Sequence, residues 1–383
     1  MTTKIALVRQ EQMEGDGGAQ AIIDIILDAL GSESSIDVSL LCRHWEAEIP
    51  DTHKVILDPP YRGRIAKIKT FNHIVKDYLN THHFDLVQSH ERFSDCDIFR
   101  AGDGVHKVWL EQKARLLNPL SKAWLFQTPY HKSLMAEEKK MFESSHLRAV
   151  ICNSKMVGDE ILEHFDIAPK KIKIIHNGVD IERFHPKNRS HAKKTRHALG
   201  IPEECLLFIF PGSGFERKNL ITVIRALSHL PENIHTMIVG RDKWQRRYER
   251  LANKTNIGHR VHFLGAQKRE RMPELYAAAD ALILPTLYDP FPNVIFEAMA
   301  TGLPCITSPK CGAAIIIQDN KAGRIVDALN EVELAGAMTA YESENTRNEE
   351  GKAARTVAEQ FTIQRMRKEF IRLYRDLIKS KFQ

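Results

Sequence analysis

Residues 281–304 read ALILPTLYDPFPNVIFEAMATGLP, an apolar run followed by a polar loop and a helical pattern. The run ALILP at 281–285 has the length and apolar character of a buried strand, and NVIFEAMATG reads as a helix that ends at Gly302. The loop YDPFP therefore lies at the carboxyl end of a strand and leads into a helix N-terminus. Because ligands of open α/β sheets bind at this edge, the segment predicts both a parallel sheet and a binding site.

The same alternation of strand and helix patterns runs along the whole chain of 383 residues. Longer helical patterns, such as AQAIIDIILDAL at 19–30 and NLITVIRALSHL at 219–230, separate short β-type runs. Because those runs are apolar throughout, they indicate parallel sheets covered on both faces, and we predict a doubly wound α/β protein. The expected strands are 4–8, 36–41, 54–58, 84–88, 148–152, 206–210, 234–239, 261–265, 281–285 and 304–307.

The pattern runs twice, which together with the chain length predicts two domains. A glycine-rich turn follows the first strand of each half, GDGGAQ at 15–20 and PGSGFERKN at 211–219. A segment rich in Asn, Pro and basic residues separates the halves, so we place the boundary near residue 183. The predicted domains are 1–183 and 184–363.

A final helix, 364–383, carries one apolar stripe at helical spacing with Arg and Lys on its other faces. We expect it to pack back on the first domain. The alternative is that its basic face lies near anionic lipid. The stripe consists of Met366, Phe370, Leu373 and Leu377.

Composition limits the function classes. With 43% hydrophobic and 27% charged residues, the chain has the composition of a globular protein, and no apolar run has the length of a membrane span. The N-terminus lacks the features of a signal peptide, so we expect a cytoplasmic protein. The six cysteines are scattered without zinc-type spacing, which indicates reduced thiols. The basic segments are not interleaved with aromatic residues, which argues against a nucleic-acid partner.

The turn GSGFERKN at 212–219 suits a diphosphate. Gly212 and Gly214 let the backbone approach a ligand closely, and Arg217 and Lys218 add two cations at the start of the next helix. The turn matches neither the P-loop nor the dinucleotide-binding fingerprint. The alternative is an ordinary turn followed by a solvated basic helix.

The loop at 288–293 supplies complementary groups. Asp289 is an acceptor for hydroxyl groups, and Asn293 is a candidate N-cap for the following helix. Glu297, one helical turn further on, can accept a vicinal diol such as that of ribose. The alternative is that Asp289 shapes a turn and Glu297 lies on a solvated face. Because the neighbours of Glu297 in VIFEAMA are apolar, its carboxylate should have a partner.

Taken together, these residues resemble the retaining nucleotide-sugar glycosyltransferases of the GT-B fold, in the glycogen-synthase-like glycosyltransferase family four. The family hallmark is an acid, seven residues and a glutamate followed by A-M-A-x-G-x-P, here Asp289, Glu297 and AMATGLP. The segments NGVDIERFHP, GSGFERKN and GDGGAQ resemble other family elements. Within the family, VGRDK at 239–243, CGAAIII at 311–317 and AGDGVHKVWLEQK at 101–113 are similar to enzymes that glucosylate the lipopolysaccharide inner-core heptose.

The resemblance implies two Rossmann-like domains that face a cleft, with the nucleotide on the C-terminal domain and the acceptor on the N-terminal one. It implies that Arg217 and Lys218 neutralise the diphosphate and that Glu297 binds the ribose. Two departures, Asp289 where glutamate is usual and Pro292 where glycine often supplies an amide, leave the donor sugar open. The remaining implied contacts are Phe263 and Leu264 with the base, Asp289, Phe291, Asn293 and Val294 with the transferred sugar, and Gly17, Gly18 and Gly214 with the phosphates.

For the acceptor side, the candidates follow a strand of the first domain. They are His90 in QSHERF and, favoured by family logic, Asp103 and His106 in AGDGVHK. The triplet Asp95-Cys96-Asp97 has the D-x-D pattern of a metal site, but we reject it because it lies in the acceptor domain. We expect neither a metal nor a cofactor.

The resulting expectation is a retaining, metal-independent hexosyltransferase that moves glucose from UDP-glucose to the lipopolysaccharide core of a bacterium. We expect it to be peripheral on the cytoplasmic face of the inner membrane, since a lipid-linked acceptor requires docking on an anionic surface. The alternatives are a family member that uses UDP-N-acetylglucosamine or GDP-mannose on another lipid-linked or glycan acceptor, and a UDP-sugar epimerase of the same fold.

Overall fold

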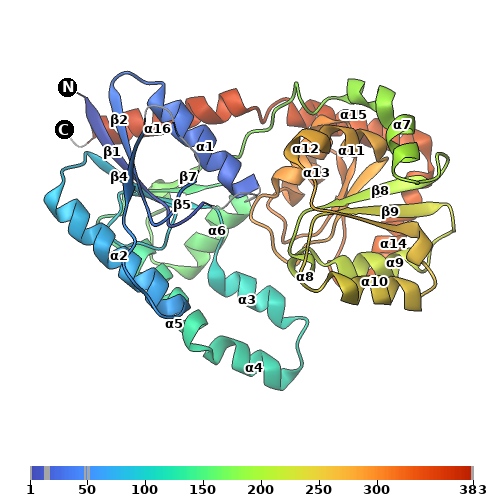
Figure 1. The fold of residues 1–383 in the computed structure, drawn as a ribbon, viewed down its shortest axis with the longest axis horizontal. Coiled ribbons are helices and arrows are strands. Elements are labelled where there is room, and N and C mark those ends of the chain that lie inside the picture. The colour runs from blue at the N-terminus through green and yellow to red at the C-terminus, as the bar shows by residue number, and fades with distance from the viewer. Residues whose placement is uncertain (1, 13–17, 47–48, 50–51, 381–383) are drawn as a thin grey trace. The chain divides into compact units, whose positions relative to one another are not determined.

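The computed structural model describes residues 2–12, 18–46, 49 and 52–380, which fall into two compact units. The first unit is Met1–His176 with Gln364–Gln383, and the second is Asn177–Ile363 (Figure 1). The division therefore precedes the predicted boundary near residue 183. The reason is that the chain after residue 176 joins the second unit, where the Val179 N–H donates to the Phe361 carbonyl over 2.8 Å.

The described residues of the first unit form a seven-stranded sheet in the order β3-β2-β1-β4-β5-β6-β7, with every strand pair parallel. Helices cover both faces of this sheet (Figure 1). The strands are β1 Thr3–Val8, β2 Ile36–Cys42, β3 Thr52–Ile56, β4 Leu86–Ser89, β5 Ile98–Ala101, β6 Ala149–Cys152 and β7 Ile172–Ile174. The helices are α1 Gly18–Gly31, α2 Arg64–Thr81, α3 His106–Ala114, α4 Pro119–Gln127, α5 Pro129–Phe142, α6 Lys155–His164 and α16 Ile363–Lys379.

The second unit repeats the plan with a six-stranded parallel sheet in the order β10-β9-β8-β11-β12-β13. Its strands are β8 Leu206–Pro211, β9 Ile234–Val239, β10 Val261–Gly265, β11 Ala281–Leu284, β12 Cys305–Thr307 and β13 Gly323–Ile325. Its helices are α7 Ala192–Ala198, α8 Phe215–Lys218, α9 Leu220–Leu227, α10 Gln245–Lys254, α11 Met272–Ala278, α12 Asn293–Ala300, α13 Ala314–Asp319, α14 Glu331–Thr339 and α15 Glu344–Ala358.

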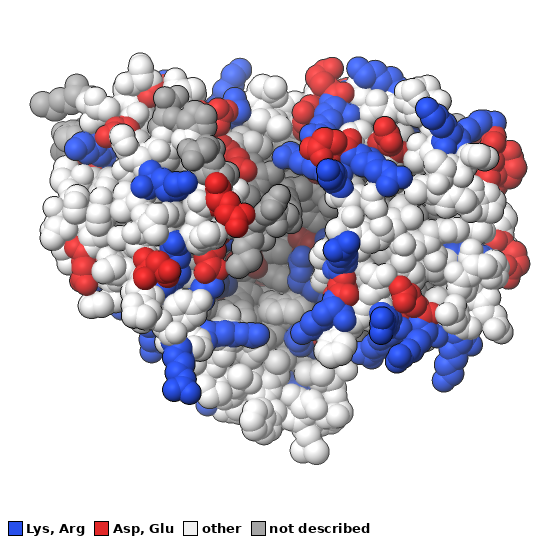
Figure 2. Space-filling view, viewed as in Figure 1, with Lys and Arg blue, Asp and Glu red and all other residues white. Residues whose placement is uncertain are grey.

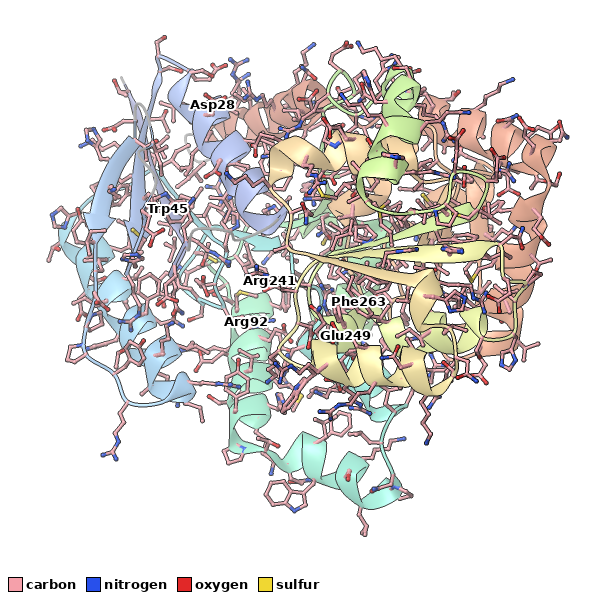
Figure 3. All side chains as sticks on the ribbon, turned by 45° about the vertical axis from the view of Figure 1, so that its right-hand side comes forward. Asp28, Trp45, Arg92, Arg241, Glu249 and Phe263 are labelled. Atoms are coloured by element: carbon pink, nitrogen blue, oxygen red, sulfur yellow. The ribbon has the colours of Figure 1, made fainter. Side chains whose placement is uncertain are left out.

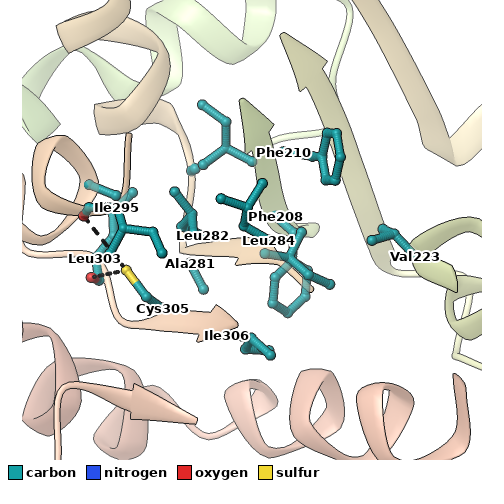
Figure 4. Packing of buried hydrophobic residues seen from close by; sticks show 14 of the residues in the cluster. Phe208, Phe210, Val223, Ala281, Leu282, Leu284, Ile295, Leu303, Cys305 and Ile306 are labelled. Atoms are coloured by element: carbon teal, nitrogen blue, oxygen red, sulfur yellow. Dashed lines mark hydrogen bonds between the residues drawn. The ribbon is translucent and has the colours of Figure 1, made fainter. Parts of the chain in front are cut away.

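The central strands of the second unit are buried on both faces. All residues of β8, β9 and β11 are buried, which explains why they lack the alternation of a half-exposed strand. Figure 4 shows Phe208 and Phe210 of β8 packed near Leu282 and Leu284 of β11. In the same core, the Cys305 thiol lies 3.6 Å from the Leu303 carbonyl. This rigid layer fixes the positions of the loops that leave its carboxyl edge.

The C-terminal helix α16 belongs to the core of the first unit. Met366, Phe370, Leu373 and Tyr374 are buried against α1 and the sheet, while Leu377 is only partly buried. The apolar stripe predicted from the sequence is therefore the face of α16 that packs on the first unit. Tyr374, which the predicted stripe did not include, is also buried in this face. Its hydroxyl donates to the buried Gln88 side chain. None of the helices that the structure describes combines the length and apolar character needed to cross a bilayer.

Candidate functional site

In the turn after β8, the side chain of Lys218 lies close to the backbone of Gly212. Gly212 and Gly214 both have positive φ, 110° and 75°. A Cβ on Gly212 would lie 2.5 Å from Cε of Lys218, so only glycine permits this close approach. Helix α8 is a single turn that ends at Lys218, and Asn219 then adopts a left-handed conformation before α9 begins. The sequence analysis predicted that Arg217 and Lys218 stand at the start of the long helix. They lie instead at the end of the single-turn helix α8, and the long helix α9 begins after them.

Arg217, Lys218 and Asp289 form one charged cluster. The Arg217 guanidinium donates to Asp289 Oδ2 over 3.0 Å, and Lys218 Nζ lies 3.6 Å from the same oxygen. Lys218 is buried, and this burial lowers the pKa of its ammonium group, with the Asp289 carboxylate opposing the shift. Two cations therefore face one acid, which leaves a net positive charge where strands β8 and β11 end.

Backbone contacts hold the two turns together. The Leu287 N–H donates to the Arg217 carbonyl over 2.9 Å, and the Thr286 hydroxyl donates to the same carbonyl. Asp289 is fixed from its other side, where its N–H donates to the Lys310 carbonyl and its carbonyl accepts from the Gly312 N–H. The segment that begins CGAAIII thus lies directly against the loop of Asp289, and the cluster rests on three strand ends.

Helix α12 begins one residue earlier than the capping pattern predicted. Its N-cap is Pro292, and Asn293 is the first helical residue. The Asn293 side chain accepts a hydrogen bond from Asn177 Nδ2 over 2.8 Å, so the prediction of Asn293 as the N-cap is wrong. Phe291 is buried and stacks on Phe296, so its side chain is part of the core. Val294 is half-buried against the core.

Glu297 has the partner that its apolar neighbourhood demanded. The hydroxyl of Tyr276 on α11, which is fully buried, donates to Glu297 Oε2 over 2.8 Å. Burial raises the pKa of the Glu297 carboxyl, while Tyr276, Arg269 and Arg183 oppose the rise. Tyr276 was missed from the sequence because its own segment, ELYAAAD, shows only the pattern of a core helix.

Strand β10 ends beside a basic residue from the neighbouring loop. Phe263 and Leu264 are half-buried, and the Leu264 carbonyl accepts from the Gln267 side chain over 2.6 Å. Arg241 Nε lies 3.8 Å from the position of a Cβ on Gly265. Figure 3 shows Arg241 and Phe263 from neighbouring segments of the second unit. The end of β10 therefore has a cation beside it.

Hydrogen bonds connect the loop that carries Arg241 with the turn GSGFERKN after β8. The Asp242 carboxylate accepts from the Phe215 N–H over 2.9 Å, at the start of α8. The Arg241 N–H donates to the Ser213 hydroxyl over 3.4 Å. Neither residue was predicted as part of the site, although VGRDK was noted as a family-like segment. Asp242 has a positioning role, because it fixes the turn that presents Lys218.

In the first unit, His106 lies in a buried network after β5. Its backbone N–H donates to the Glu138 carboxylate, which is 1% exposed and pairs with Arg92 over 3.0 Å. Its ring Nε2 lies 3.0 Å from Nδ1 of His131 on α5. Burial, together with Arg92, lowers the pKa of His106 to about 4, so the ring is neutral at physiological pH. Asp103 is exposed and interacts electrostatically with Arg92 of this network. Arg92 is labelled in Figure 3.

The other candidates of the first unit have structural roles or lie outside the described residues. His90 is buried with its ring nitrogen 3.0 Å from Gln88 Nε2, and burial lowers its pKa well below the ordinary value. Gly18 is the first residue of α1, and Gly17 lies outside the described residues. Asp95 pairs with Lys76 over 2.9 Å. Within the described part of the chain, no His, Cys, Asp and Glu side chains gather as a metal site.

Two family models match the chain, one in each half. Residues 17–183 match the model described as Glycosyltransferase Family 4, and residues 192–357 match that of Glycosyl transferases group 1. Among curated proteins, the lipopolysaccharide glucosyltransferase WaaG of Escherichia coli is 27% identical over 317 residues, which are 79% of this chain and 81% of the relative. The D-inositol 3-phosphate glycosyltransferase of Corynebacterium diphtheriae is 23% identical over 398 residues, 94% and 92% of the two chains.

Solved structures share the architecture. The crystal structure of WaaG has a TM-score of 0.79 at 23% identity and covers 93% of this chain and 95% of its own. HepE of Anabaena, solved in complex with UDP and glucose, has a TM-score of 0.72 at 17% identity over 98% and 100% of the two chains. At these identities the likeness is one of fold, and it covers both units.

Proposed function

Because the chain belongs to the GT-B glycosyltransferases, with a Family 4 domain before a group 1 domain, we propose that it transfers a hexose with retention of configuration. The proposed donor is UDP-glucose, and the proposed acceptor is a sugar of the lipopolysaccharide inner core. The observation that carries the proposal is the cluster of Arg217 and Lys218 around Asp289. The choice of substrates is supported by the names of two relatives, a lipopolysaccharide glucosyltransferase and a protein solved with UDP and glucose.

The cationic cluster suits the departure of a nucleoside diphosphate. In the proposed reaction the bond from the anomeric carbon to the β-phosphate oxygen breaks, and negative charge develops on UDP. Arg217 and Lys218 stabilise this charge, and they do so without a metal ion. Because Lys218 is buried, its interaction with the phosphate is stronger than that of a solvent-exposed lysine.

Diphosphate binding also changes the role of Asp289. Its carboxylate is now the anionic partner of both cations. Phosphate oxygens compete for the same cations, and the Asp289 oxygens then become acceptors for hydroxyl groups of the transferred sugar. The backbone contacts with Lys310 and Gly312 keep the loop in place during this exchange.

Glu297 is the proposed ribose ligand. One of its oxygens already accepts from Tyr276, which orients the carboxylate at a fixed angle. The other oxygen accepts from a ribose hydroxyl. Since burial favours the protonated form, the contact is strongest above the raised pKa of this group.

On the acceptor side, the His106 and His131 pair is the proposed polar anchor. One ring must donate to the other across their 3.0 Å contact, so each ring keeps one nitrogen for other partners. In a same-face mechanism the departing phosphate oxygen takes the acceptor's proton, and the acceptor oxygen bonds to the anomeric carbon. The protein then contributes by positioning and electrostatic stabilisation.

The test is a transfer assay with UDP-glucose and lipopolysaccharide truncated after the inner-core heptoses, run with and without EDTA. The expected result is one added hexose by mass spectrometry, an α-linkage by NMR and no effect of EDTA. A β-linked product would contradict retention, and loss of transfer in EDTA would contradict metal independence. Transfer to water alone would contradict the proposed acceptor.

A second acceptor class is supported by the D-inositol 3-phosphate glycosyltransferases among the relatives. We therefore include an inositol phosphate acceptor and the donors UDP-N-acetylglucosamine and GDP-mannose in the same assay. A product with inositol phosphate and none with the lipopolysaccharide core would move the enzyme to that activity.

A further inference from the structure

Helix α10 and the loop before it form a strongly basic surface on the second unit. Residues 241–254 contain six Lys or Arg residues and two acids. The Asp242 carboxylate accepts from backbone N–H groups, and that of Glu249 accepts from the Gln245 side chain over 2.8 Å. The cations after Arg241 are exposed, and none forms an ion pair in the part of the chain that the structure describes. With Trp244 they make up the α10 surface: Lys243, Arg246, Arg247, Arg250 and Lys254.

Helix α14 and the chain that follows it carry the opposite charge on the same unit. Residues 325–346 contain neither Lys nor Arg, and their five acids are Asp327, Glu331, Glu333, Glu342 and Glu344. Glu331 is partly neutralised, because Arg225 and His229 of α9 lie 4.0 Å and 3.7 Å from it. The acids of this segment that are exposed and, among the described residues, have no Lys, Arg or His in an ion pair are Glu333, Glu342 and Glu344.

An exposed apolar side chain lies within each charged segment. In the second unit, whose residues 177–363 are all described, the exposed large hydrophobic residues are Trp244, Ile315 and Val332. Trp244 precedes α10 and is 61% exposed, and Val332 of α14 is 72% exposed. Gly336 and Thr339 follow Val332 at helical spacing and are also exposed, so this face of α14 carries no long side chain. We call Val332, Gly336 and Thr339, with the three exposed acids, the α14 surface.

Helix α9 lies between the two charged surfaces. It packs against α10 on one side and against α14 on the other, and the three helices cover one face of the sheet (Figure 1). In Figure 2, Lys and Arg side chains gather along the lower part of the second unit, where Figure 1 places α10. A two-fold axis over α9 would bring the α14 surface of a second copy onto α10 and its α10 surface onto α14. Both contacts would therefore form at once.

We propose that two copies of this chain associate through their α10 and α14 surfaces. The arginines of one copy face the acids of the other, and opposite charges fix how the two copies align. Trp244 packs on the flat face of α14 around Val332, and an aromatic anchor of this kind contributes strongly to an interface. Because each copy offers both surfaces, the association closes at two copies. The contact lies on the second unit alone and goes beyond the proposed function.

The first test is the mass of the full chain in solution, measured by analytical ultracentrifugation over a range of protein and salt concentrations. The wild type is expected to have twice the mass of one chain in low salt. Its dissociation constant is expected to rise at least about tenfold from about 0.1 M to about 1 M salt, because the screening length falls from about 10 Å to about 3 Å. A single-chain mass at the highest protein concentration would overturn the proposal. So would a mass that keeps growing with concentration.

Reversal of charge tests which surfaces meet. Arg246→Glu with Arg250→Glu, and separately Glu333→Arg with Glu342→Arg, are each expected to weaken self-association at least about a hundredfold. The reason is that like charges then face each other at both contacts. An equal mixture of the two variants is expected to recover the wild-type mass, since every contact in the mixed pair joins opposite charges. Circular dichroism shows whether each variant is folded, and two folded variants that do not associate when mixed would overturn the proposal.

The first matched control is Lys139→Glu with Lys140→Glu, which reverses two exposed cations on α5 of the first unit. It should keep the wild-type mass. Trp244→Ala should weaken association about tenfold, whereas Trp124→Ala, which removes a 74% exposed tryptophan from α4, should not. Dissociation in either control, or unchanged association in Trp244→Ala, would contradict the assignment to the α10 surface.

UDP affinity, measured by calorimetry on the wild type, keeps this proposal separate from the proposed function. A wild type that binds UDP but has the mass of one chain would overturn the association and leave the proposed function standing. A wild type that forms the pair but binds no nucleotide would overturn the proposed function and leave the association standing.

Discussion

The two units place polar groups at the same edge of similar sheets, but they assemble them in different ways. In the second unit, Arg217 and Lys218 lie in the single-turn helix α8 that follows β8, and Asp289 lies in the loop that follows β11. In the first unit, His106 obtains its partners His131 and Glu138 from α5, a helix further along the chain. Groups that follow strand ends are recognisable from local sequence, whereas partners supplied by another helix are not. The proposed function places the donor on the second unit and the acceptor on the first, and the predictions below test that placement.

The strongest way to break this assignment is Lys218→Ala. We expect kcat to fall about 100- to 1000-fold, because one preorganised cation is removed from the departing phosphate. Steady-state kinetics with UDP-glucose and the core acceptor measures the effect, and Lys352→Ala on α15 is the control for the loss of a lysine. Wild-type turnover in Lys218→Ala would remove this residue from the phosphate site.

A smaller effect is expected from Glu297→Gln. Loss of a charged acceptor for the ribose should weaken UDP binding about 10- to 100-fold, as measured by calorimetry. Affinity equal to that of the wild type would contradict the ribose assignment.

The same variant tests the pH dependence. Burial raises the pKa of Glu297, so its carboxylate takes up a proton at a higher pH than that of an ordinary glutamate does. Wild-type affinity for UDP should therefore decline as the pH falls through this raised value, and Glu297→Gln should lack that component. The difference between the two proteins cancels the titration of the nucleotide. Parallel pH profiles would contradict the assignment.

The smallest effect is expected in the first unit, from His131→Phe. Loss of the hydrogen bond that orients His106 should lower kcat/KM for the acceptor about fivefold and leave UDP affinity unchanged. The exposed residue His146 offers a matched control in His146→Phe. Weaker UDP binding in His131→Phe, with normal use of the acceptor, would reverse the roles of the two units.

Much of the fold could be predicted from the sequence, because apolar runs in parallel sheets are strong signals. All ten predicted strand segments correspond to strands, while β5, β7 and β13 were missed. The run IFRA of β5 contains a buried arginine, Arg100, which conceals its apolar character. The edge strands β7 and β13 have three residues each, too few to establish a pattern.

The site was predictable in part. The residues that gather around Asp289 lie in motifs at strand ends, so each could be identified from the sequence. Their approach depends on the pairing of β8 with β11, which only the structure shows. The N-cap prediction failed because Asn293 finds a tertiary partner in Asn177. Tyr276 and Glu138 lie in helices that resemble ordinary core helices in the sequence, and only packing reveals what their side chains contact.

The most direct test of the account is calorimetric titration of the wild-type protein and Lys218→Ala with UDP, GDP and ADP, each in EDTA. The account predicts that the wild type prefers UDP without a metal ion, and that Lys218→Ala binds it more weakly. If no nucleotide binds the wild type, or if Lys218→Ala binds UDP as tightly as the wild type does, the cluster around Asp289 is not the site of the donor diphosphate.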